Sequence, residues 1–374
     1  MSKNDLPLLA QALRHRAIEV PTLPGGIFIE VVFGCPHSCM MCEANRERIE
    51  QFPASLVERL DPYLDNFEYI ALVGFGEPLL SNKLDYFTKR CAQNNTVIHT
   101  ITTAIRLTEE LIDTLLQAKV SICISMHAAT KKTYQRIMNA SFELAQKNIQ
   151  ALINRNTEIG FPDNEFYLSL IVMKENINEI PTFLHLAKKL KVSKVRFQTL
   201  SPNFRTLLGK PRKHDGFIFR HLEQSNQNIK NQFLEDLPKI QNLAEQLGIE
   251  IRGGSMEHAA REITQYHDGS AILNMGLQKI IGKPVLPLIK RKGFCAAPWL
   301  GELCVRADGN VVLCGTSIDI VGNLYKQPLE EVWNSERMQQ IRRDFSNGVF
   351  PRACGNCRGV TSANYPSNAF SGLH

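Results

Sequence analysis

Cysteines carry the clearest chemistry in this sequence, because eight of the ten fall into two groups with spacing that suits metal ligation. The first group is Cys35, Cys39 and Cys42, which are three thiols within eight residues. A closed zinc site requires four ligands, and so does an iron–sulfur cluster that only transfers electrons. Three thiolates around a 4Fe–4S cluster leave one iron with an open position for a substrate or cosubstrate. A zinc or redox loop is the alternative for these residues.

The second group lies near the other end of the chain and contains five cysteines, of which four form the candidate ligand set: Cys295, Cys314, Cys354 and Cys357. Four thiolates can saturate a cluster, so that none of its irons stays open. They can also form a structural zinc ribbon, which is the alternative here. Cys304 is a spare thiol across a predicted hairpin from Cys314. The two isolated cysteines are expected to be buried apolar fillers; they are Cys91 and Cys123.

The elements that position the first group follow an alternating β/α pattern. The apolar run from Ile27 to Phe33 predicts a buried strand, which Gly34 and Pro36 end directly at the thiols. Amphipathic helices separate the further predicted strands, which are residues 69–73, 96–102, 120–125, 166–173 and 194–200. Such alternation predicts parallel strands with right-handed crossovers, here in six units. The cysteine loop then lies at the carboxyl ends of the strands, where barrels carry their chemistry.

The barrel pattern occupies residues 27–254, after a short lead-in formed by residues 1–26. A polar connection follows the sixth strand. A long helix is predicted from Phe217 to Gln246, and a short strand between Gly248 and Gly254 ends the barrel domain.

A smaller domain is predicted for residues 295–357, beyond a bridging segment of residues 255–294 that glycine and proline interrupt. Asp308-Gly309 between two β-rich runs predicts a hairpin, and a helix is expected from Leu329 to Phe345. Residues 358–374 form a polar tail.

The CxxxCxxC spacing directly after the first strand resembles the radical SAM superfamily. In that family the open iron of a 4Fe–4S cluster chelates the amino and carboxylate groups of S-adenosylmethionine (SAM). Reductive cleavage then leaves a 5′-deoxyadenosyl radical, which takes a hydrogen from the substrate. Six β/α units also resemble the open, three-quarter barrel of this family. The resemblance implies an α/β fold with a partial (β/α)6 barrel, SAM, and a SAM-binding 4Fe–4S cluster on Cys35, Cys39 and Cys42.

After the second predicted strand, the stretch Gly74-Phe-Gly76-Glu77-Pro is similar to the family's Gly-Gly-Glu-Pro stretch. There the backbone and the glutamate contact the amino group of SAM. A glycine permits close approach of a backbone, and a carboxylate suits an ammonium group. The resemblance therefore makes Gly74, Gly76 and Glu77 candidate cofactor-binding residues.

Three polar residues end other strands at the same predicted mouth. Ser125 ends the fourth strand and is a candidate SAM ligand by the same resemblance, and Asn176, just after the fifth strand, is another. His127 follows Ser125 at a position where relatives commonly have an acid. His127 is a candidate to bind the SAM ribose or to act on the substrate, and the alternative is a histidine that is only satisfied by hydrogen bonds.

The C-terminal cysteines resemble the SPASM/twitch extension found in one branch of the superfamily. Its pattern is a cysteine, a spacer, Gly-x-x-x-x-Cys and a later CxxC, which match Cys295, Gly309, Cys314, Cys354 and Cys357. No cysteine follows the last of these. The resemblance is thus to the one-cluster, twitch-like version, with one auxiliary 4Fe–4S cluster.

Taken as a whole, the resemblance implies an enzyme that abstracts hydrogen from a small-molecule or peptide substrate, with oxidation, epimerisation or cross-linking as outcomes. It implies an electron donor such as reduced flavodoxin or ferredoxin. A function from another class remains open, namely a non-catalytic zinc-binding module with two cysteine metal sites.

Composition excludes several other classes of function. The formal net charge of +6 over 374 residues is mild, and the densest basic run, Lys290-Arg-Lys292, is expected to be a solvated loop. We therefore expect no nucleic-acid partner. No apolar run reaches the roughly 20 residues that span a membrane. Clustered thiols without an export signal at residues 1–7 predict a cytoplasmic protein.

Overall fold

The computed structural model describes residues 6–42, 44, 47–94, 96–160, 164–200, 211–252, 295–301, 303–315, 317 and 319–350. Among these residues no helix is long and apolar enough to cross a membrane. The predicted bridging segment, residues 255–294, and the predicted tail, residues 358–374, lie outside the described residues.

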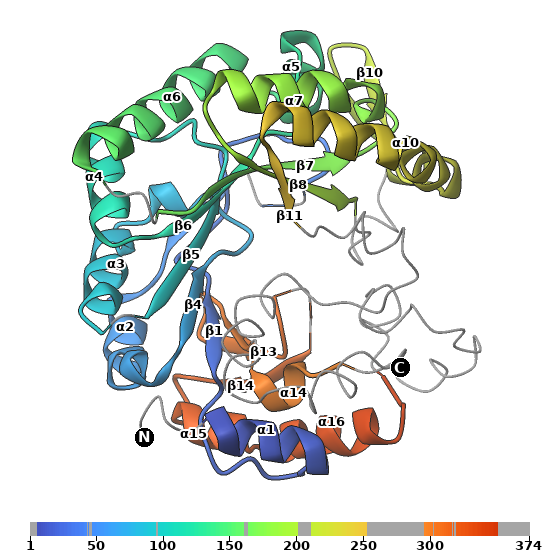
Figure 1. Ribbon diagram of the computed structural model, residues 1–374. Coiled ribbons are helices and arrows are strands. Elements are labelled where there is room, and N and C mark those ends of the chain that lie inside the picture. The colour runs from blue at the N-terminus through green and yellow to red at the C-terminus, as the bar shows by residue number, and fades with distance from the viewer. Residues whose placement is uncertain are drawn as a thin grey trace.

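One curved sheet runs through the described chain, with strand order β11-β8-β7-β6-β5-β4-β1-β12-β13-β14 (Figure 1). Its first seven strands are all parallel. In chain order they are β1 (Gly26–Ile29), β4 (Tyr69–Leu72), β5 (Val97–Thr102), β6 (Ser121–Ser125), β7 (Phe166–Val172), β8 (Lys194–Thr199) and β11 (Glu250–Arg252). This arrangement confirms the predicted α/β class and the open, partial barrel.

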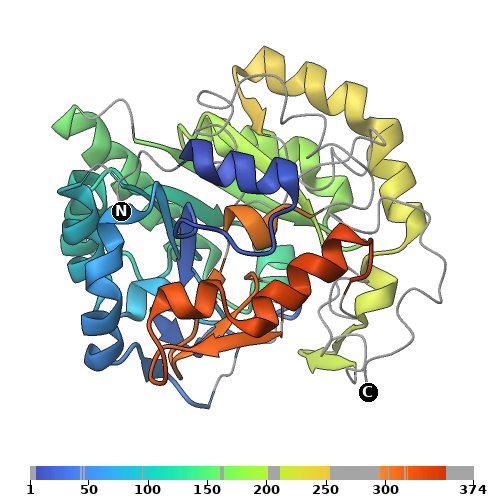
Figure 2. The same cartoon turned by 90° about the horizontal axis from the view of Figure 1, so that it is seen from below.

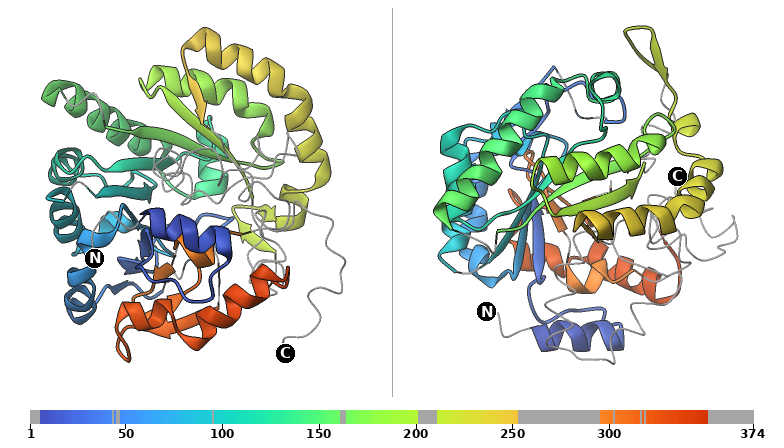
Figure 3. Two further views of the ribbon diagram at one scale, coloured as in Figure 1. Left: turned by 60° about the horizontal axis from the view of Figure 1, so that its bottom comes forward. Right: turned by 45° about the horizontal axis from the view of Figure 1, so that its top comes forward.

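Helices cover the outer face of this sheet (Figures 1 and 3). They are α2 (Ala54–Leu60), the 3-10 turn η2 (Asp61–Asn66), α3 (Leu84–Ala92), α4 (Glu109–Gln117), α6 (Phe142–Ile159), α7 (Ile180–Lys189) and α10 (Gln227–Leu247). Side-chain caps fix where several begin, because Thr108, Ser141 and Asn226 accept hydrogen bonds from the first turns of α4, α6 and α10. Short elements lie at the strand ends: η3 (Pro78–Leu80), α5 (Lys131–Met138), η4 (Ile177–Glu179) and α9 (His221–Gln224).

The two faces of the sheet differ in polarity because side chains alternate along each strand. Ile98, Ile122 and Leu168 are at most 1% exposed and belong to the apolar core. The opposite face, called the inner face below, carries polar residues such as His99 and Arg196 at intervening positions. Core packing under the helices thus fixes the register, and the inner face is left to carry chemistry.

The C-terminal domain extends the same sheet. Strand β12 (Leu303–Val305) pairs in parallel with β1, and β13 (Asn310–Val312) and β14 (Ile320–Asn323) follow antiparallel. Gly309 at the hairpin turn has φ +81°, which confirms the predicted Asp-Gly hairpin. The helices of this domain are α14 (Ala297–Leu300), α15 (Leu329–Trp333) and α16 (Glu336–Ser346).

The N-terminal helix α1 (Leu6–His15) lies beside the C-terminal helices (Figure 2). Arg342 of α16 is 0% exposed and donates to the carbonyls of Ile18 and Pro298, at 2.9 and 2.8 Å. The indole of Trp299 donates to the carbonyl of Ala17 at 2.9 Å. The predicted lead-in therefore ties the start of the barrel to the C-terminal domain.

Three predicted elements differ from the observed ones. The strand expected from Ile27 to Phe33 is broken after Ile29, and β2 (Val32–Phe33) pairs with β3 (Glu50–Gln51). The break occurs at Glu30, whose N–H donates to the carbonyl of Val305 in β12 at 2.9 Å. The buried carboxyl of Glu30 also has a partner of its own, described below.

The helix expected from Phe217 instead begins at Gln227, after a hairpin of β9 (Arg212–His214) and β10 (Phe217–Phe219). Asp215 and Gly216 both have positive φ, 44° and 76°, as a tight hairpin turn requires. The helix expected from Leu329 to Phe345 is two helices, because Ser335 caps a new helix by accepting from the N–H of Met338.

Candidate functional site

The cysteine loop begins in a conformation that favours glycine. Gly34 has φ +89°, and a Cβ there would lie 2.1 Å from the carbonyl oxygen of Arg48. Its N–H donates to the carbonyl of Phe75 at 3.1 Å, which joins this loop to the loop after β4. Cys35 and Cys39 follow and are 9% and 8% exposed. The three predicted thiols therefore come from one loop at the carboxyl end of β1.

Two elements hold the cysteine loop from outside the sheet. The N–H of Met40 donates to the carbonyl of Ile137, at the end of α5, at 2.8 Å. The guanidinium of Arg212 in β9 donates to the carbonyls of Cys39 and Met40, at 3.2 and 3.3 Å, and also to that of Cys42. The N–H of Ala44 points at the Cys42 sulfur at 3.4 Å. The loop is thus positioned by contacts at several backbone atoms.

Glu77 joins the ends of β4 and β5 through a saturated set of hydrogen bonds. Its Oε1 accepts from the Thr102 hydroxyl at 2.5 Å and from the N–H of Leu79 at 3.4 Å. Its Oε2 accepts from the N–H and the hydroxyl of Thr103, at 3.0 and 2.9 Å. A carboxylate has about four acceptor sites, so that these donors fill them. The Glu77 side chain is 2% exposed and acts here as a brace between two loops.

The glycines of the same stretch make room for neighbouring chain. A Cβ on Gly74 would lie 2.4 Å from Cγ of Glu30, and one on Gly76 would lie 2.2 Å from the carbonyl oxygen of Val32. The N–H of Phe75 donates to Glu30 Oε1 at 2.8 Å. Burial raises the pKa of Glu30, and the backbone of Phe75 and the charge of Arg306 oppose that shift. Glycine at these positions therefore allows the loop after β4 to pack on the strand that leads to the cysteines.

The other predicted SAM ligands divide into two kinds. Ser125 ends β6 on the inner face and is partly exposed. Asn176 is 0% exposed; its amide donates to the carbonyls of His127 and Ile171, both at 2.8 Å, and its oxygen accepts from the N–H of Met173. Both amide protons of Asn176 are thus engaged within the protein, which gives it a structural role in the turn after β7. We do not include it in the SAM site proposed below.

His127 lies between β6 and β7 and is 6% exposed. Burial lowers its pKa to about 4, so that the ring is neutral at pH 7. Its Nδ1 is 3.0 Å from the carbonyl oxygen of Ser169 and 3.2 Å from the backbone nitrogen of Ile171. A protonated Nδ1 donates to Ser169 and an unprotonated Nδ1 accepts from Ile171, so that either neutral tautomer is held by the backbone of β7.

Among the described C-terminal cysteines, Cys304 lies on β12, the strand next to β1. Cys304 pairs in register with Phe28 of β1, on the inner face, and it is 6% exposed. Burial raises its pKa to about 12, and the nearby charges of Glu30 and Cys314 act in the same direction. Cys354 and Cys357 lie outside the described residues. Within the described part of the chain no three His, Cys, Asp or Glu side chains form a single-ion site.

A buried hydroxyl lies next to the cysteine loop without a partner. Tyr134 of α5 is 0% exposed, and its Oη makes no hydrogen bond to the described residues. Burial raises its pKa, as do the negative charges of Cys39 and Glu77. A donor of this kind, close to three clustered thiols, fits a bound anionic group such as an iron–sulfur cluster.

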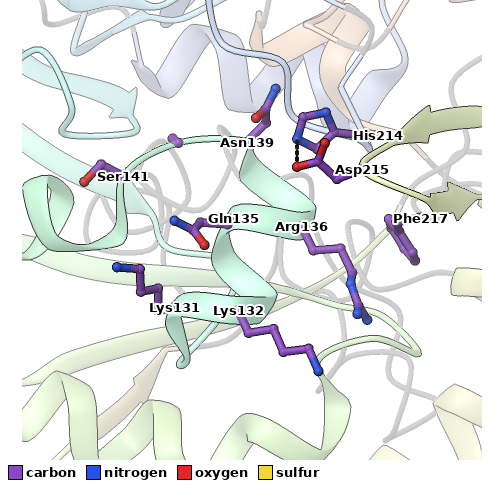
Figure 4. A pocket seen from close by; sticks show the side chains of 10 residues that line it. Lys131, Lys132, Gln135, Arg136, Asn139, Ser141, His214, Asp215 and Phe217 are labelled. Atoms are coloured by element: carbon purple, nitrogen blue, oxygen red, sulfur yellow. Dashed lines mark ion pairs between the residues drawn. The ribbon is translucent and has the colours of Figure 1, made fainter.

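A cavity of about 820 Å³ lies between α5 and the β9–β10 hairpin (Figure 4). Lys132, Arg136 and Phe217 line it, and the Arg136 guanidinium is 5.1 Å from the Phe217 ring centroid. The Arg136 guanidinium also pairs with Glu175 at 2.8 Å. The same two elements, α5 and β9, hold the cysteine loop. The cavity is therefore a basic pocket next to the candidate metal site.

The sequence does not single out several residues of the site, namely Glu30, Tyr134 and Arg212. Glu30 was visible in the sequence as a charged residue within an apolar strand. The roles of Tyr134 and Arg212 depend on tertiary contacts with the cysteine loop, and no local pattern marks them.

Comparison with known proteins identifies the class. The model of the radical SAM superfamily matches residues 29–187, and that of SPASM, an iron–sulfur cluster-binding domain, matches residues 295–358. The chain therefore belongs to the radical SAM superfamily and carries a C-terminal SPASM domain. Its cofactors are those of the two domains: a 4Fe–4S cluster with SAM, and auxiliary iron–sulfur.

Solved structures share the fold at low sequence identity. Streptococcus suis SuiB has a TM-score of 0.63 at 16% identity, over 96% of this chain and 75% of SuiB. The enzyme anSMEcpe with bound AdoMet has a TM-score of 0.58 at 16% identity, over 89% of this chain and 83% of that one. A search of curated proteins found no match. At these identities the likeness concerns the fold alone.

Proposed function

We propose that this enzyme cleaves SAM reductively and abstracts a hydrogen atom from a peptide or small-molecule substrate. The observation that carries the proposal is the three-cysteine loop at the carboxyl end of β1, joined by Gly34 to the glycine-rich loop after β4. When bound, the 4Fe–4S cluster and SAM supply a 5′-deoxyadenosyl radical. The protein's own contribution is to hold these groups, to orient the substrate and to exclude water.

Cys35, Cys39 and Cys42 are the proposed cluster ligands, and they leave one position for SAM. The backbone between Gly74 and Glu77 is proposed to meet the SAM amino group. Because the Glu77 carboxylate is filled by protein donors, we assign it the task of fixing that backbone. Ser125 is the proposed ligand from β6.

The auxiliary site is proposed to hold one 4Fe–4S cluster on Cys295, Cys314, Cys354 and Cys357. Four thiolates leave no exchangeable position, which suits a cluster that transfers an electron. Its proposed task is to accept the electron left on the substrate after hydrogen abstraction. Oxidation or cross-linking follows from such a step, while epimerisation does not require it.

A peptide is the substrate class that the structural neighbours favour. SuiB has been solved bound to the precursor peptide SuiA, and anSMEcpe with AdoMet and the peptide Cp18Cys. A small molecule is the second candidate.

The electron donor is proposed to be reduced flavodoxin or ferredoxin. The basic pocket of Lys132 and Arg136 suits such a donor, because these carriers are acidic. Turnover driven by that carrier should fall as salt is raised, and turnover driven by dithionite should not.

Anaerobic reconstitution tests the proposal. The reconstituted protein should be brown, should contain about eight irons by ligand arithmetic, and should form 5′-deoxyadenosine from SAM with dithionite. The competing zinc module predicts a colourless protein that contains zinc and leaves SAM intact. That outcome, in folded protein reconstituted with iron and sulfide, would overturn the proposed function.

A further inference from the structure

His37 lies in the middle of the cysteine loop, two residues after Cys35 and two before Cys39. Its side chain is half-buried, and its Nε2 is 3.3 Å from the hydroxyl oxygen of Thr103, just after β5. This contact joins the cysteine loop to the end of another strand, 66 residues further along the chain. His37 therefore has a defined partner outside the loop that carries the thiols.

The direction of this hydrogen bond follows from the other contacts of Thr103. The Thr103 hydroxyl has one proton, which it donates to Oε2 of Glu77 at 2.9 Å. The hydroxyl oxygen is then left to accept, so that the ring of His37 donates through Nε2. Because Nε2 also carries a proton in the charged ring, this bond does not depend on the charge of His37.

Two links connect the cysteine loop with the loop after β4. The first is at the start of the cysteine loop, where the N–H of Gly34 donates to the carbonyl of Phe75 at 3.1 Å. The second runs from His37 through the hydroxyl of Thr103 to the carboxylate of Glu77. Since the two links start three residues apart, together they fix the orientation of the cysteine loop as well as its distance from the loop after β4.

Both loops belong to the proposed SAM site. SAM has two anchors there, the open position of the cluster on the cysteine loop and the backbone between Gly74 and Glu77. A ligand that must meet two anchors binds more tightly when they are already held in the bound arrangement, because less order has to be imposed on binding. The hydrogen bond of His37 holds these two anchors relative to each other.

We propose that His37 is a positioning residue for SAM, because it fixes the cysteine loop relative to the backbone that meets the SAM amino group. His37 acts through Thr103 and Glu77 and is not a ligand of the cluster. The inference rests on the proposed function, since it takes these two loops as the two sides of the SAM site.

The test compares His37→Leu, which removes the donor, with His37→Gln, which keeps an N–H donor of similar reach. SAM affinity of the anaerobically reconstituted proteins is measured by titration calorimetry. The KM for SAM is measured from dithionite-driven formation of 5′-deoxyadenosine. His37→Leu should bind SAM about two- to tenfold more weakly, as expected for the loss of one hydrogen bond. Its KM should rise by the same factor, with iron content and kcat close to those of the wild type. His37→Gln should keep most of the affinity.

A double-mutant cycle tests whether His37 acts through the hydroxyl of Thr103. Thr103→Val removes that hydroxyl and keeps the shape of the side chain. Once the hydroxyl is absent, His37 has lost its acceptor, so that adding His37→Leu to Thr103→Val should weaken SAM binding no further. Independent effects, in which the two factors multiply, would overturn the inference.

Folding of each variant is checked by thermal unfolding of the metal-free protein, and His37→Phe, which also lacks the donor, replaces His37→Leu if the latter does not fold. Wild-type SAM affinity in a folded, fully loaded variant without the donor would overturn the inference. Loss of iron from that variant would assign His37 to the metal and would overturn it too. Failure of the wild type to bind and cleave SAM would instead refute the proposed function.

Discussion

Glu77 offers the sharpest test of how the site is built, because its carboxylate holds two loops and its removal leaves defined groups unpaired. In Glu77→Gln the amide oxygen can still accept from the N–H and hydroxyl of Thr103. The amide nitrogen then faces the N–H of Leu79 and the hydroxyl of Thr102, which can turn to accept. In Glu77→Ala all four donors lose their acceptor.

Hydrogen bonds to a charged group contribute about 1.5–3 kcal/mol, against about 0.5–1.5 kcal/mol for neutral pairs. In Glu77→Gln the two hydrogen bonds from Thr103 become bonds between neutral groups, and the N–H of Leu79 is left unpaired. We therefore expect the free energy of unfolding to fall by about 2–4 kcal/mol. Glu77→Ala should lose about 3–5 kcal/mol, because the fixed N–H of Thr103 and two hydroxyls are then unsatisfied beside a cavity. For a chain of this size each kcal/mol corresponds to about 1–2 °C in melting temperature.

The assay is thermal unfolding of the metal-free protein, in which neither cluster nor SAM contributes. Glu77→Gln should melt roughly 2–8 °C lower and Glu77→Ala lower still. The control Glu58→Gln, at an exposed position of α2, should stay within about 0.5 kcal/mol of the wild type. In reconstituted protein Glu77→Gln should bind SAM more weakly and keep its cluster spectrum. If both Glu77 variants melted at the wild-type temperature, Glu77 would not hold the two loops together, and this result would refute the structural role irrespective of SAM binding.

Three further predictions concern the metal sites and pH. Substitution of Cys35, Cys39 and Cys42 together by alanine should leave about half of the iron in the reconstituted protein. Full retention of the iron would contradict their assignment as cluster ligands. Cys314→Ala should still form 5′-deoxyadenosine with dithionite but fail to complete turnover, and full turnover without the auxiliary cluster would reduce that domain to a structural role. Because the folded-state pKa of His127 is about 4, below its ordinary value near 6.5, the unfolded chain binds the proton first as pH falls. The melting temperature of the metal-free protein should therefore drop between about pH 6.5 and 4, less so in His127→Asn, and equal slopes would contradict the buried, neutral ring.

The fold was predictable wherever a local pattern and a tertiary requirement coincide. Apolar β-branched runs between amphipathic helices define the parallel strands, because each strand must bury one face under those helices. The hairpin at Asp308-Gly309 was found from its turn residues. The same turn chemistry is present at Asp215-Gly216, where both residues have positive φ, and it outweighs the helical pattern of the neighbouring residues. That hairpin was predictable from the sequence and was missed.

The cysteine ligands of the candidate site could be predicted from the sequence, whereas the residues that hold the cysteine loop in place could not. The spacing of the cysteines is a local property that a loop can carry alone. The partners of that loop come from distant parts of the chain, since Arg212 lies 173 residues after Cys39 and Ile137 comes from the short helix after β6. Gly74 illustrates the difference: it was assigned to SAM contact, and its missing Cβ also makes room for Glu30. Such packing roles depend on coordinates that no single stretch encodes.

The position of β1 connects the two metal sites more directly than the order of domains suggests. It lies between β4, which leads to Glu77, and β12, which carries Cys304. Glu30, just after β1, donates its N–H to Val305 and accepts from the N–H of Phe75. Glu30 thus connects the hairpin of β12 and β13 to the loop after β4 through two hydrogen bonds. A shift of that hairpin would therefore also move the loop after β4. Loss of 5′-deoxyadenosine in a folded auxiliary-site variant would accordingly indicate that this route through Glu30 outweighs the support that α5 and Arg212 give the cysteine loop.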